Sequence, residues 1–322
     1  MQKFDEKPEL KIICMEDINA TEVEWLWYPY IPKGRLTIVQ GDPGEGKTTF
    51  ILQVAAILSR GDYLPFSEQK SNPINVIFQT AEDGLSDTVK PRLIEAHADS
   101  SRIYVIDDSE YSLTLSDERI EHAIEETKSR CIILDPIQGY LGAKIDMNRA
   151  NEIRPVLMRL SSIAEKYNTA IVLLAHMNKG NGIKHIYRGL GSIDFMAAAR
   201  SVLVVGRIND NPKVRVVAHG KSSLAPEGRS VAFELSEENG FKWLGYYDIT
   251  VDDLLMGGVR ENKSQTAEKM LKDILKDGEV EQKEILERAT SIGISKRTLD
   301  EVKKGLSIKS KRIGNAWYWK LP

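Results

Sequence analysis

The sequence has few cysteines, no long apolar run and no apolar start. Its two cysteines, Cys14 and Cys131, stand far apart without spaced partners, which favours a reducing cytoplasm and argues against a zinc site. The longest apolar runs, such as residues 170–175, fall far below the ~20 residues that a membrane-spanning helix needs. Residues 1–10 lack the apolar stretch of a signal peptide. We therefore expect a cytoplasmic protein without a disulfide, a structural zinc ion or a membrane segment.

Charge is plentiful but unevenly distributed along the chain. The 44 basic and 47 acidic residues leave a net charge of −3. From Ser291 to Pro322, eight basic residues stand against two acidic ones, so this end carries +6 and the remainder carries −9. A basic end on an acidic body is a modest indication of contact with nucleic acid, and an ordinary solvated face is the alternative.

Short apolar runs alternate with stretches of helical periodicity over most of the chain. The runs are continuous and rich in β-branched residues, which predicts strands buried on both faces of a mostly parallel sheet. They lie at 35–40, 74–80, 102–107, 131–135, 170–176 and 201–207, with helical stretches at 47–59, 84–98, 117–128 and 155–167. Three closely spaced strands after residue 206 predict an antiparallel extension. The expected fold class is α/β, with helices on both faces of the sheet.

The C-terminal part of the chain has a different pattern. Beyond a polar stretch with a glycine pair, three amphipathic segments and two short strands predict a small winged-helix-like domain, with Ser295 as the N-cap of the third helix. The predicted organisation is an N-terminal arm (1–30), the α/β domain (31–249), a linker (250–264) and the winged-helix-like domain (265–322).

The segment GDPGEGKT at 41–48 lies directly between a predicted strand and a predicted helix. It fits the P-loop pattern, in which glycines let backbone N–H groups turn inward and bind phosphate at a helix N-terminus. A chance glycine turn is the alternative, but both flanking elements of a P-loop are present. The predicted ATP site comprises Gly41, Asp42, Pro43, Gly44, Glu45, Gly46, Lys47, Thr48 and Thr49. Lys47 would lie against the β- and γ-phosphates, and Thr48 would bind Mg²⁺.

Acidic residues follow two other strands of the predicted sheet. Asp135 ends the run 131–135, where an α/β sheet presents ligands, and we expect it to hold Mg²⁺ together with Thr48. Glu82 and Asp83 follow the run 74–80, where a carboxylate could deprotonate the attacking water. Glu82 is the predicted base, because an acid at position 83 also suits the cap of the next helix. Asp83 is the alternative base.

His176 ends another apolar run and precedes a glycine-rich, basic loop. Its position predicts a sensor beside the γ-phosphate, and a histidine that only satisfies its own hydrogen bonds is the alternative. Lys179, Lys184 and Arg188 in the loop are predicted DNA contacts, against the alternative of a solvated connection. Four aromatic residues between positions 25 and 30 either stack on adenine or a neighbouring subunit, or pack over the core.

The segments GDPGEGKTT, QTAEDG, CIILDP and LLAHMNKG, in this order and spacing, resemble the motif set of RecA-like hexameric replicative helicases. The RepA group of plasmids and mobile elements is the most similar. The resemblance implies a RecA-like core that uses ATP and Mg²⁺. It assigns the Walker A lysine to Lys47, the magnesium-binding hydroxyl to Thr48, the Walker B aspartate to Asp135, the catalytic glutamate to Glu82 and the link between γ-phosphate and DNA loop to His176.

The same resemblance implies two arginines that assist hydrolysis. Arg92 matches an arginine near the site, and Arg200 matches the arginine finger that a neighbouring subunit supplies. Arg188 and Arg207 are competing fingers, and a structural ion pair is the alternative role of Arg200. A finger from the neighbour makes hydrolysis depend on assembly, here into a hexameric ring around single-stranded DNA. A primase or an initiator is a further implied partner.

The expected function is therefore a DNA-dependent ATPase that works as a ring-forming helicase in the replication of a mobile element or phage. A RecA/RadA-like recombination ATPase and an ATP-switched assembly factor that binds a DNA site are the alternatives. The predicted DNA contacts of the C-terminal domain are Lys296, Arg297, Lys303, Lys304, Lys311 and Arg312. A protein partner for this domain is the competing interpretation.

Overall fold

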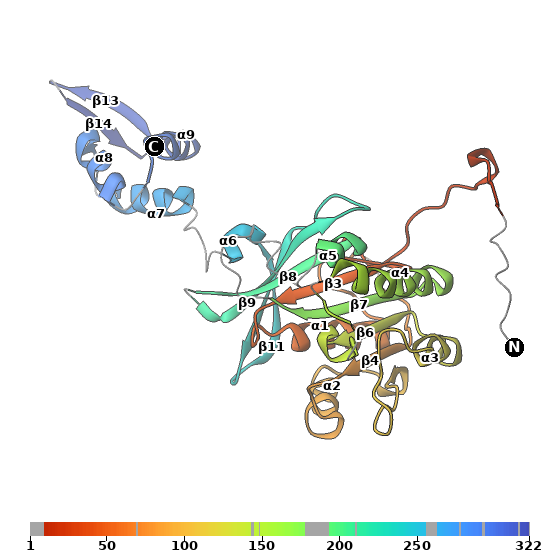
Figure 1. The fold of residues 1–322 in the computed structure, drawn as a ribbon. Coiled ribbons are helices and arrows are strands. Elements are labelled where there is room, and N and C mark those ends of the chain that lie inside the picture. The colour runs from red at the N-terminus through yellow and green to blue at the C-terminus, as the bar shows by residue number, and fades with distance from the viewer. Residues whose placement is uncertain are drawn as a thin grey trace, which may run out of the picture.

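The computed structural model describes residues 10–68, 70–142, 145–147, 149–177, 193–209, 211–255, 263–276, 278–291, 294–314 and 316–321. Most of the chain folds around one large sheet, and the C-terminal residues form a smaller group of helices and strands (Figure 1). Within the ranges given above, no helix combines the length and the apolar character needed to cross a membrane.

The large sheet has nine strands in the order β11-β10-β9-β8-β3-β7-β6-β4-β5 (Figure 1). The six strands from β8 to β5 in this order pair in parallel, and β9, β10 and β11 extend the sheet antiparallel from β8. The α/β prediction is thereby confirmed, as is the antiparallel extension. The strands are β3 (Leu36–Gly41), β4 (Val76–Thr80), β5 (Ile103–Tyr104), β6 (Cys131–Asp135), β7 (Ala170–His176), β8 (Ser201–Ile208), β9 (Asn211–Ser222), β10 (Ser230–Ser236) and β11 (Gly240–Tyr247).

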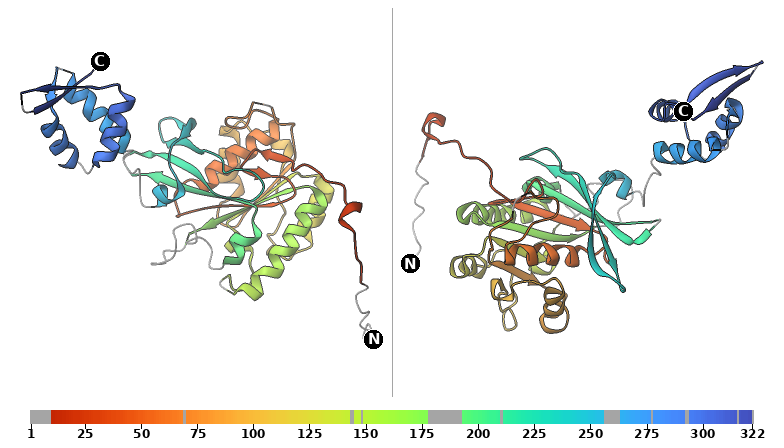
Figure 2. Two further views of the ribbon diagram at one scale, coloured as in Figure 1. Left: turned by 90° about the horizontal axis from the view of Figure 1, so that it is seen from above. Right: turned by 180° about the vertical axis from the view of Figure 1, so that it is seen from behind.

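Helices cover both faces of this sheet (Figure 2). One face packs against α1 (Lys47–Arg60), the π-helical turn η2 (Leu85–Val89) and α2 (Lys90–Glu95). The other packs against α3 (Arg119–Thr127), the turn η4 (Ile137–Tyr140), α4 (Ala150–Tyr167) and α5 (Ile193–Ala198). The central strands are buried at almost every position, because helices lie on both sides of them.

A short helix, α6 (Val251–Leu255), forms within the segment that the sequence suggested as a linker. Its start is capped reciprocally, since the Asp253 N–H donates to Thr250 Oγ1 (3.2 Å) and the Thr250 hydroxyl donates to Asp253 Oδ2 (2.6 Å). Leu254 packs over Gly206 of β8, where an added Cβ would lie 2.9 Å from Leu254 Cγ. The capping pair and the apolar side chains of α6 are enough to hold this polar segment on the sheet.

The aromatic lead-in forms a small hairpin of β1 (Trp25–Trp27) and β2 (Ile31–Pro32), preceded by the 3-10 turn η1 (Met15–Asp17). Trp27 and Tyr30 are buried in the core that α1 shares with the sheet. The Trp27 indole donates to the Pro65 carbonyl (3.1 Å), and the Tyr30 hydroxyl donates to the Arg229 carbonyl (2.7 Å). These two rings pack over the core, so neither is available to stack on adenine.

Two elements differ in length from the prediction. The strand predicted at 102–107 follows the 3-10 turn η3 (Ser100–Arg102) and ends at Tyr104. The buried Gln79 side chain donates to the Ile106 carbonyl and accepts from the Ile106 N–H, both at 3.0 Å, and so takes the bonds a neighbouring strand would make. The helix predicted from residue 155 instead begins at Ala150, with Pro155 inside it. Pro155 lacks the N–H that would donate to the Asn151 carbonyl, but the helix continues through it.

The C-terminal residues form a compact unit with a core of its own. It contains α7 (Lys263–Leu275), α8 (Gln282–Ser291), α9 (Lys296–Gly305) and a sheet of β12 (Val280–Glu281), β14 (Ala316–Lys320) and β13 (Lys309–Ile313) in that order. The Ser295 hydroxyl accepts from the Thr298 N–H (3.2 Å), as the predicted N-cap of α9 requires. The winged-helix interpretation of this unit stays a prediction.

Candidate functional site

The P-loop connects β3 to α1 at the carboxyl edge of the sheet. Gly44 (φ +80°) and Gly46 (φ +86°) have left-handed backbone that residues with a side chain rarely adopt, which turns the loop around its own interior. Lys47 is buried, and its ammonium donates to the carbonyls of Gly41 and Asp42, both at 2.9 Å. Burial lowers the pKa of Lys47, while Asp135 and other nearby acids raise it.

Gly41 is required by the neighbouring strand. A Cβ added there would lie 2.2 Å from the Val205 carbonyl oxygen of β8, a distance that no side chain tolerates. The first glycine of the P-loop therefore lets β8 approach, whereas Gly44 and Gly46 curve the loop.

Thr48 and Asp135 meet at the start of α1 and the end of β6. The Thr48 hydroxyl donates to Asp135 Oδ2 at 2.6 Å, a short charge-assisted bond. Burial raises the pKa of the Asp135 carboxyl to about 6, against the lowering effects of Thr48 and Lys47. A hydroxyl and a buried carboxylate side by side offer the oxygen donors that Mg²⁺ prefers, and a divalent cation would offset the burial of that carboxylate. The two residues therefore fit the predicted metal site.

His176 joins the P-loop to Glu82. Its Nδ1 lies 3.3 Å from Lys47 Nζ, and its Nε2 lies 3.4 Å from Glu82 Oε1. Because the lysine ammonium is a donor only, Nδ1 accepts and the proton of the neutral ring lies on Nε2, facing the carboxylate. Glu82 itself is largely exposed, with 61% of its side chain accessible. Residues from three motifs far apart in the sequence thus form one connected group.

Asp83 does not cap the next helix. The residue before η2 is Gly84, with no side-chain cap, and Asp83 instead forms an ion pair with Arg92 Nη1 at 3.0 Å. Arg92 therefore pairs with the residue next to the predicted base. The Asp83 carboxylate, which was the alternative base, is engaged in this ion pair. The Thr80 hydroxyl accepts from the N–H groups of both Glu82 (3.3 Å) and Asp83 (3.1 Å), which fixes the turn after β4.

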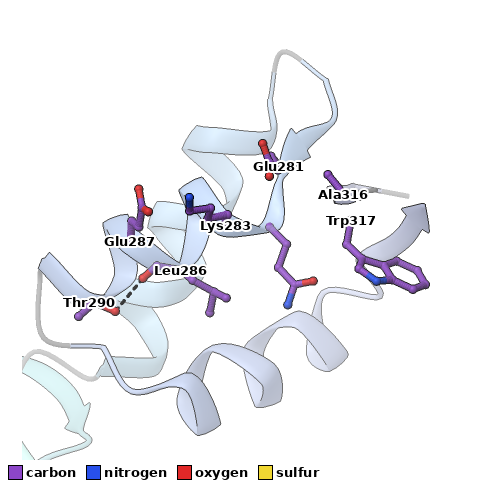
Figure 3. Close-up of a pocket in the computed structure, with 8 residues that line it drawn as sticks. Glu281, Lys283, Leu286, Glu287, Thr290, Ala316 and Trp317 are labelled. Carbon is purple, nitrogen blue, oxygen red and sulfur yellow. Dashed lines mark hydrogen bonds between the residues drawn. The ribbon is translucent and has the colours of Figure 1, made fainter. Parts of the chain in front are cut away.

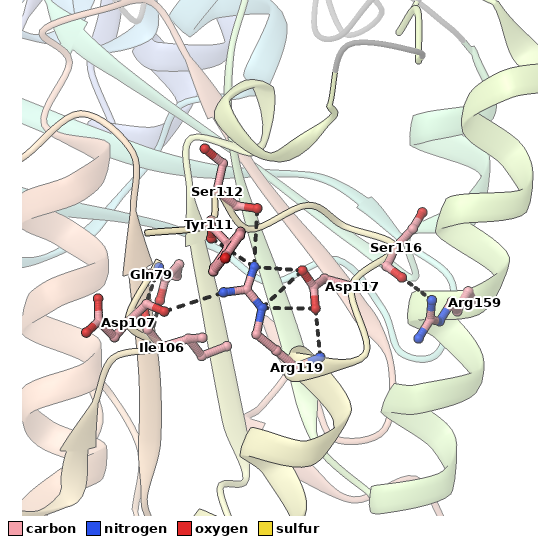
Figure 4. Close-up of polar contacts among 9 residues, drawn as sticks. All are labelled: Gln79, Ile106, Asp107, Tyr111, Ser112, Ser116, Asp117, Arg119 and Arg159. Carbon is pink, nitrogen blue, oxygen red and sulfur yellow. Dashed lines mark hydrogen bonds and ion pairs between the residues drawn. The ribbon is translucent and has the colours of Figure 1, made fainter. Parts of the chain in front are cut away.

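Arg119 fixes the loop after β5, as Figure 4 shows. The guanidinium pairs with Asp117 at 2.8 Å and donates to the carbonyls of Asp107, Tyr111 and Ser112. One arginine thereby satisfies several carbonyls of an irregular loop that no strand could pair.

Arg200 lies far from the P-loop of its own chain. It precedes β8 at the amino edge of the sheet, where its N–H donates to the Leu36 carbonyl, and its side chain is exposed. The loop residues predicted to contact DNA, which are Lys179, Lys184 and Arg188, lie outside the described residues. Arg200 thus lies at the edge of the sheet opposite the P-loop of its own chain.

Arg207, a competing finger, contacts the P-loop of its own chain. Its Nη2 donates to the Gly44 carbonyl at 3.0 Å, and its Nε lies 3.8 Å from Glu45 Oε2. Arg215, which sequence analysis did not single out, lies opposite Arg207 on β9 and is buried. Its signal was a charged residue within the apolar run VRVVAH, because arginine is rarely buried without a partner.

The basic C-terminal residues divide into two groups. Lys303 of α9 donates to Ser310 Oγ (2.6 Å) and lies 4.1 Å from the centre of the Trp319 ring, so it is held within the unit. The side chain of Arg297 lies outside the described residues. The remaining predicted contacts, Lys296, Lys304, Lys311 and Arg312, are exposed.

An open groove of about 690 Å³ lies in the same unit, between α8 and β14 (Figure 3). Leu286 and Trp317 provide apolar surface, and Glu281, Lys283 and Glu287 are charged residues along it. Arg312 is paired with Trp317 across β13 and β14, so one of the exposed basic residues borders the groove.

Residues 14–182 match the model of a protein family described as AAA domain, AAA_25. The match covers more than half of the chain and includes the P-loop, Glu82, Asp135 and His176. The chain belongs to this family. The AAA domain thus contains the whole connected group from Lys47 to Glu82, whereas β8 to β11 and the C-terminal unit lie beyond the match.

Curated relatives of the AAA domain are called DNA repair protein RadA. The chain is 26% identical over 210 residues to that of Helicobacter pylori, covering 65% of this chain and 41% of the relative. It is 30% identical over 156 residues to that of Halalkalibacterium halodurans, covering 48% and 30%. The chain thus spans less than half the length of these relatives.

Two solved structures share the fold of the AAA domain. One is described as an ATPase domain and superposes with a TM-score of 0.50 at 16% identity, covering 67% of this chain and 86% of that chain. The other, a DnaB-like replicative helicase, superposes with a TM-score of 0.51 at 16% identity, covering 66% and 57%. These likenesses show that the chain has the α/β fold of such ATPase domains.

Proposed function

We propose that this protein is a DNA-dependent ATPase that works as a ring-forming replicative helicase of a mobile element or phage. The supporting observation is the contact of His176 with both Lys47 and Glu82. His176 ends β7, and the glycine-rich basic segment predicted to grip single-stranded DNA follows directly. A change at the phosphate site would thus reach the DNA-contacting segment through one side chain.

The positions of the side chains support the following hydrolysis step. The β- and γ-phosphates bind to the inward-facing N–H groups of the P-loop and to the Lys47 ammonium. Lys47 then donates to phosphate oxygens in place of the Gly41 and Asp42 carbonyls. Glu82 accepts a proton from the attacking water, and Arg92 holds Asp83 out of that role. Mg²⁺, held by Thr48 and Asp135, would supply positive charge to the phosphate oxygens.

Assembly would complete the site. We assign the finger to Arg200 of the next subunit, because Arg200 lies at the opposite edge of the sheet from its own P-loop. Six subunits around single-stranded DNA would place each Arg200 at a neighbour's nucleotide. A primase or an initiator remains a proposed partner for loading the ring.

A strand-displacement assay tests the proposal. Duplexes with a 3′ or a 5′ single-stranded tail are incubated with the protein and Mg-ATP, and release of the labelled strand is measured. We expect release from one tail polarity, and none with Lys47→Ala. Hydrolysis stimulated by single-stranded DNA without release of either strand would contradict the helicase and leave the ATPase standing.

A recombination ATPase is the second candidate, because the curated relatives of this chain are called DNA repair protein RadA. The same core would then assemble into open filaments on DNA. Electron microscopy of the protein with DNA and a non-hydrolysable ATP analogue separates the two, since closed rings favour the helicase and helical filaments the recombinase.

A further inference from the structure

The side chains of two arginines face the P-loop from β8 and β9. Arg207 of β8 and Arg215 of β9 are directly paired across the two strands. Both lie at odd positions, like Val205 and Val217, whose side chains belong to the core shared with α1. The P-loop crosses this face, since a Cβ added to Gly46 would lie 3.4 Å from Leu235 Cδ2 of β10.

Glu45 is the P-loop residue that faces these two cations. Only 18% of its side chain is exposed, and its Oε2 is 3.8 Å from Arg207 Nε. Burial raises the pKa of the Glu45 carboxyl, while Arg207 and, less strongly, Arg215 lower it. Like charges opposite each other on neighbouring strands repel, so the carboxylate offsets a repulsion that the two arginines would otherwise suffer.

Hydrogen bonds hold both arginines in this arrangement. Arg215 is 8% exposed and donates to the carbonyls of Pro212 (2.5 Å) and Leu235 (3.3 Å), which holds it against β10. Arg207 donates to the Gly44 carbonyl at 3.0 Å. Among the described residues, Arg207 Nε, Arg215 Nε and Glu45 Oε2 are buried without a hydrogen-bond partner, so attraction between whole charges holds the group together.

The bond from Arg207 to Gly44 fixes the direction of one P-loop amide. In a trans peptide the C=O and the following N–H point in opposite directions. With the Gly44 carbonyl turned out toward Arg207, the Glu45 N–H points into the loop, where it donates to the Asp42 carbonyl at a long 3.3 Å. A weakly bonded N–H that faces inward is a donor ready for a phosphate oxygen.

We propose that Arg207 is a positioning residue for phosphate binding, and that Glu45, Arg207 and Arg215 form a loop clamp that orients the Gly44–Glu45 peptide toward a nucleotide in the same subunit. The clamp rests on nucleotide binding by the P-loop, but not on DNA unwinding or on ring formation. It gives Arg207 a role in its own subunit, in place of a finger reaching a neighbour.

Binding of nucleotides to the full chain tests the loop clamp. Calorimetry with Mg-ADP and with a non-hydrolysable Mg-ATP analogue gives Kd for wild type, Arg207→Gln and Arg207→Lys. We expect Arg207→Gln to raise both Kd values by about tenfold, because the charge-assisted bond that orients one phosphate donor is lost. Arg207→Lys keeps the positive charge but lacks the planar guanidinium, so its Kd values should lie between those of wild type and Arg207→Gln. KM for ATP should rise in parallel with the two Kd values, because the lost interaction acts on binding.

Several outcomes would overturn the clamp. A loss confined to the ATP analogue would show that Arg207 touches the γ-phosphate, and unchanged Kd values would show that the bond to Gly44 orients nothing. Recovery of turnover on mixing Arg207→Gln with Lys47→Ala subunits would show action in a neighbour's site. Failure of wild type to bind nucleotide would instead refute the ATPase proposal itself.

A double-mutant cycle isolates the coupling within the clamp. Glu45→Gln and Arg207→Gln should each raise Kd for Mg-ADP, and the double variant should raise it by clearly less than the product of the two factors. Arg229→Gln is the control, because its guanidinium lies over the Tyr246 ring and contacts no P-loop residue in the described structure. Thermal unfolding of every variant separates misfolding from weakened binding, and full additivity in well-folded variants would refute the coupling.

Discussion

At the scale of single residues, we expect Glu82 and His176 to determine whether bound ATP is hydrolysed. Glu82→Gln removes the proposed base but keeps the size of the side chain, so turnover should fall by about 10²- to 10⁴-fold while Kd for nucleotide changes little. Steady-state hydrolysis together with calorimetry measures the two effects separately. Glu126→Gln, at an exposed position on α3, is the matched control and should behave as wild type. Comparable turnover in Glu82→Gln and wild type would move the base elsewhere.

The main residues of the site were predictable because each has a strong local signal. Lys47 and Thr48 follow a glycine pattern between a strand and a helix, and Asp135 and His176 end strands whose carboxyl edge had to adjoin the P-loop. Their mutual contacts support the roles predicted for them, and those roles stay predictions. Asp83 was misjudged, because its partner Arg92 lies nine residues away and a capping pattern does not reveal an ion pair.

At the scale of elements, the hairpin β1–β2 is attached to the sheet through a buried histidine. The Gly228 N–H donates to His219 Nδ1 (2.9 Å), and His219 Nε2 lies 3.1 Å from Ser201 Oγ, whose hydroxyl donates to the Tyr30 carbonyl (2.6 Å). Nδ1 therefore accepts, and the ring is neutral. Burial lowers the pKa of His219 from 6.5 to about 4.

Stability should depend on pH through His219. Between pH 6.5 and about 4 the unfolded chain binds a proton at this residue and the folded chain does not, so stability is full above pH 6.5 and falls as the pH drops. The difference reaches about 3 kcal/mol near pH 4. Urea unfolding at several pH values measures it, and His219→Gln should flatten this part of the profile. His122→Gln, at an exposed position on α3, should leave it unchanged.

A second prediction concerns the contact between α6 and β8. Gly206→Ala places a Cβ 2.9 Å from Leu254 Cγ and should destabilise the fold by about 1–3 kcal/mol through overpacking. Leu254→Ala should destabilise it by about 2–5 kcal/mol through a cavity. The double variant should lose less than the sum, because the new methyl group occupies part of the vacated space. Additive losses in urea unfolding would show that the two residues do not share a contact.

The lengths of elements were less predictable than their order. Strand β5 is shorter than its apolar run, because the Gln79 side chain takes the backbone bonds of Ile106. Helix α6 lies in a polar stretch and depends on the distant Gly206 for its place. Arg215 was missed because its partners on other strands and in the P-loop become neighbours only after folding. Local patterns predict elements well, whereas contacts between distant segments decide where those elements stop.

At the scale of the whole molecule, assembly should control hydrolysis through Arg200. Arg200→Ala should lose turnover by about 10³-fold or more and retain nucleotide binding. Mixing it with Lys47→Ala subunits should restore part of the activity, because each Lys47→Ala subunit supplies an intact finger. Lys213→Ala, which removes an exposed cation paired with Glu238, is the control. Wild-type turnover in Arg200→Ala would refute the finger assignment.

The C-terminal unit provides a separate test of DNA contact. Exchange of Lys304, Lys311 and Arg312 for glutamine should weaken binding of single-stranded DNA and reduce the slope of log K against log salt by about 2, as expected for three lost phosphate contacts. Fluorescence anisotropy over a salt series measures the slope.

A triple change on and after α7 is the charge-matched control for that experiment. Lys269, Lys272 and Lys276 are exposed in the same unit, and their exchange for glutamine removes as much charge from another surface. Equal losses of DNA affinity in the two triple variants would indicate a general charge effect. Unchanged DNA affinity in the variant of Lys304, Lys311 and Arg312 would favour a protein partner in the groove beside Trp317.

Strand β8 contacts the P-loop through one face and helix α6 through the other. Arg207 reaches the phosphate loop from one side of it, and the adjacent Gly206 carries α6 on the other. A ligand that displaced α6 would move β8 and so change the affinity of the protein for nucleotide. Because such coupling is reciprocal, nucleotide would change the affinity for that ligand by the same factor.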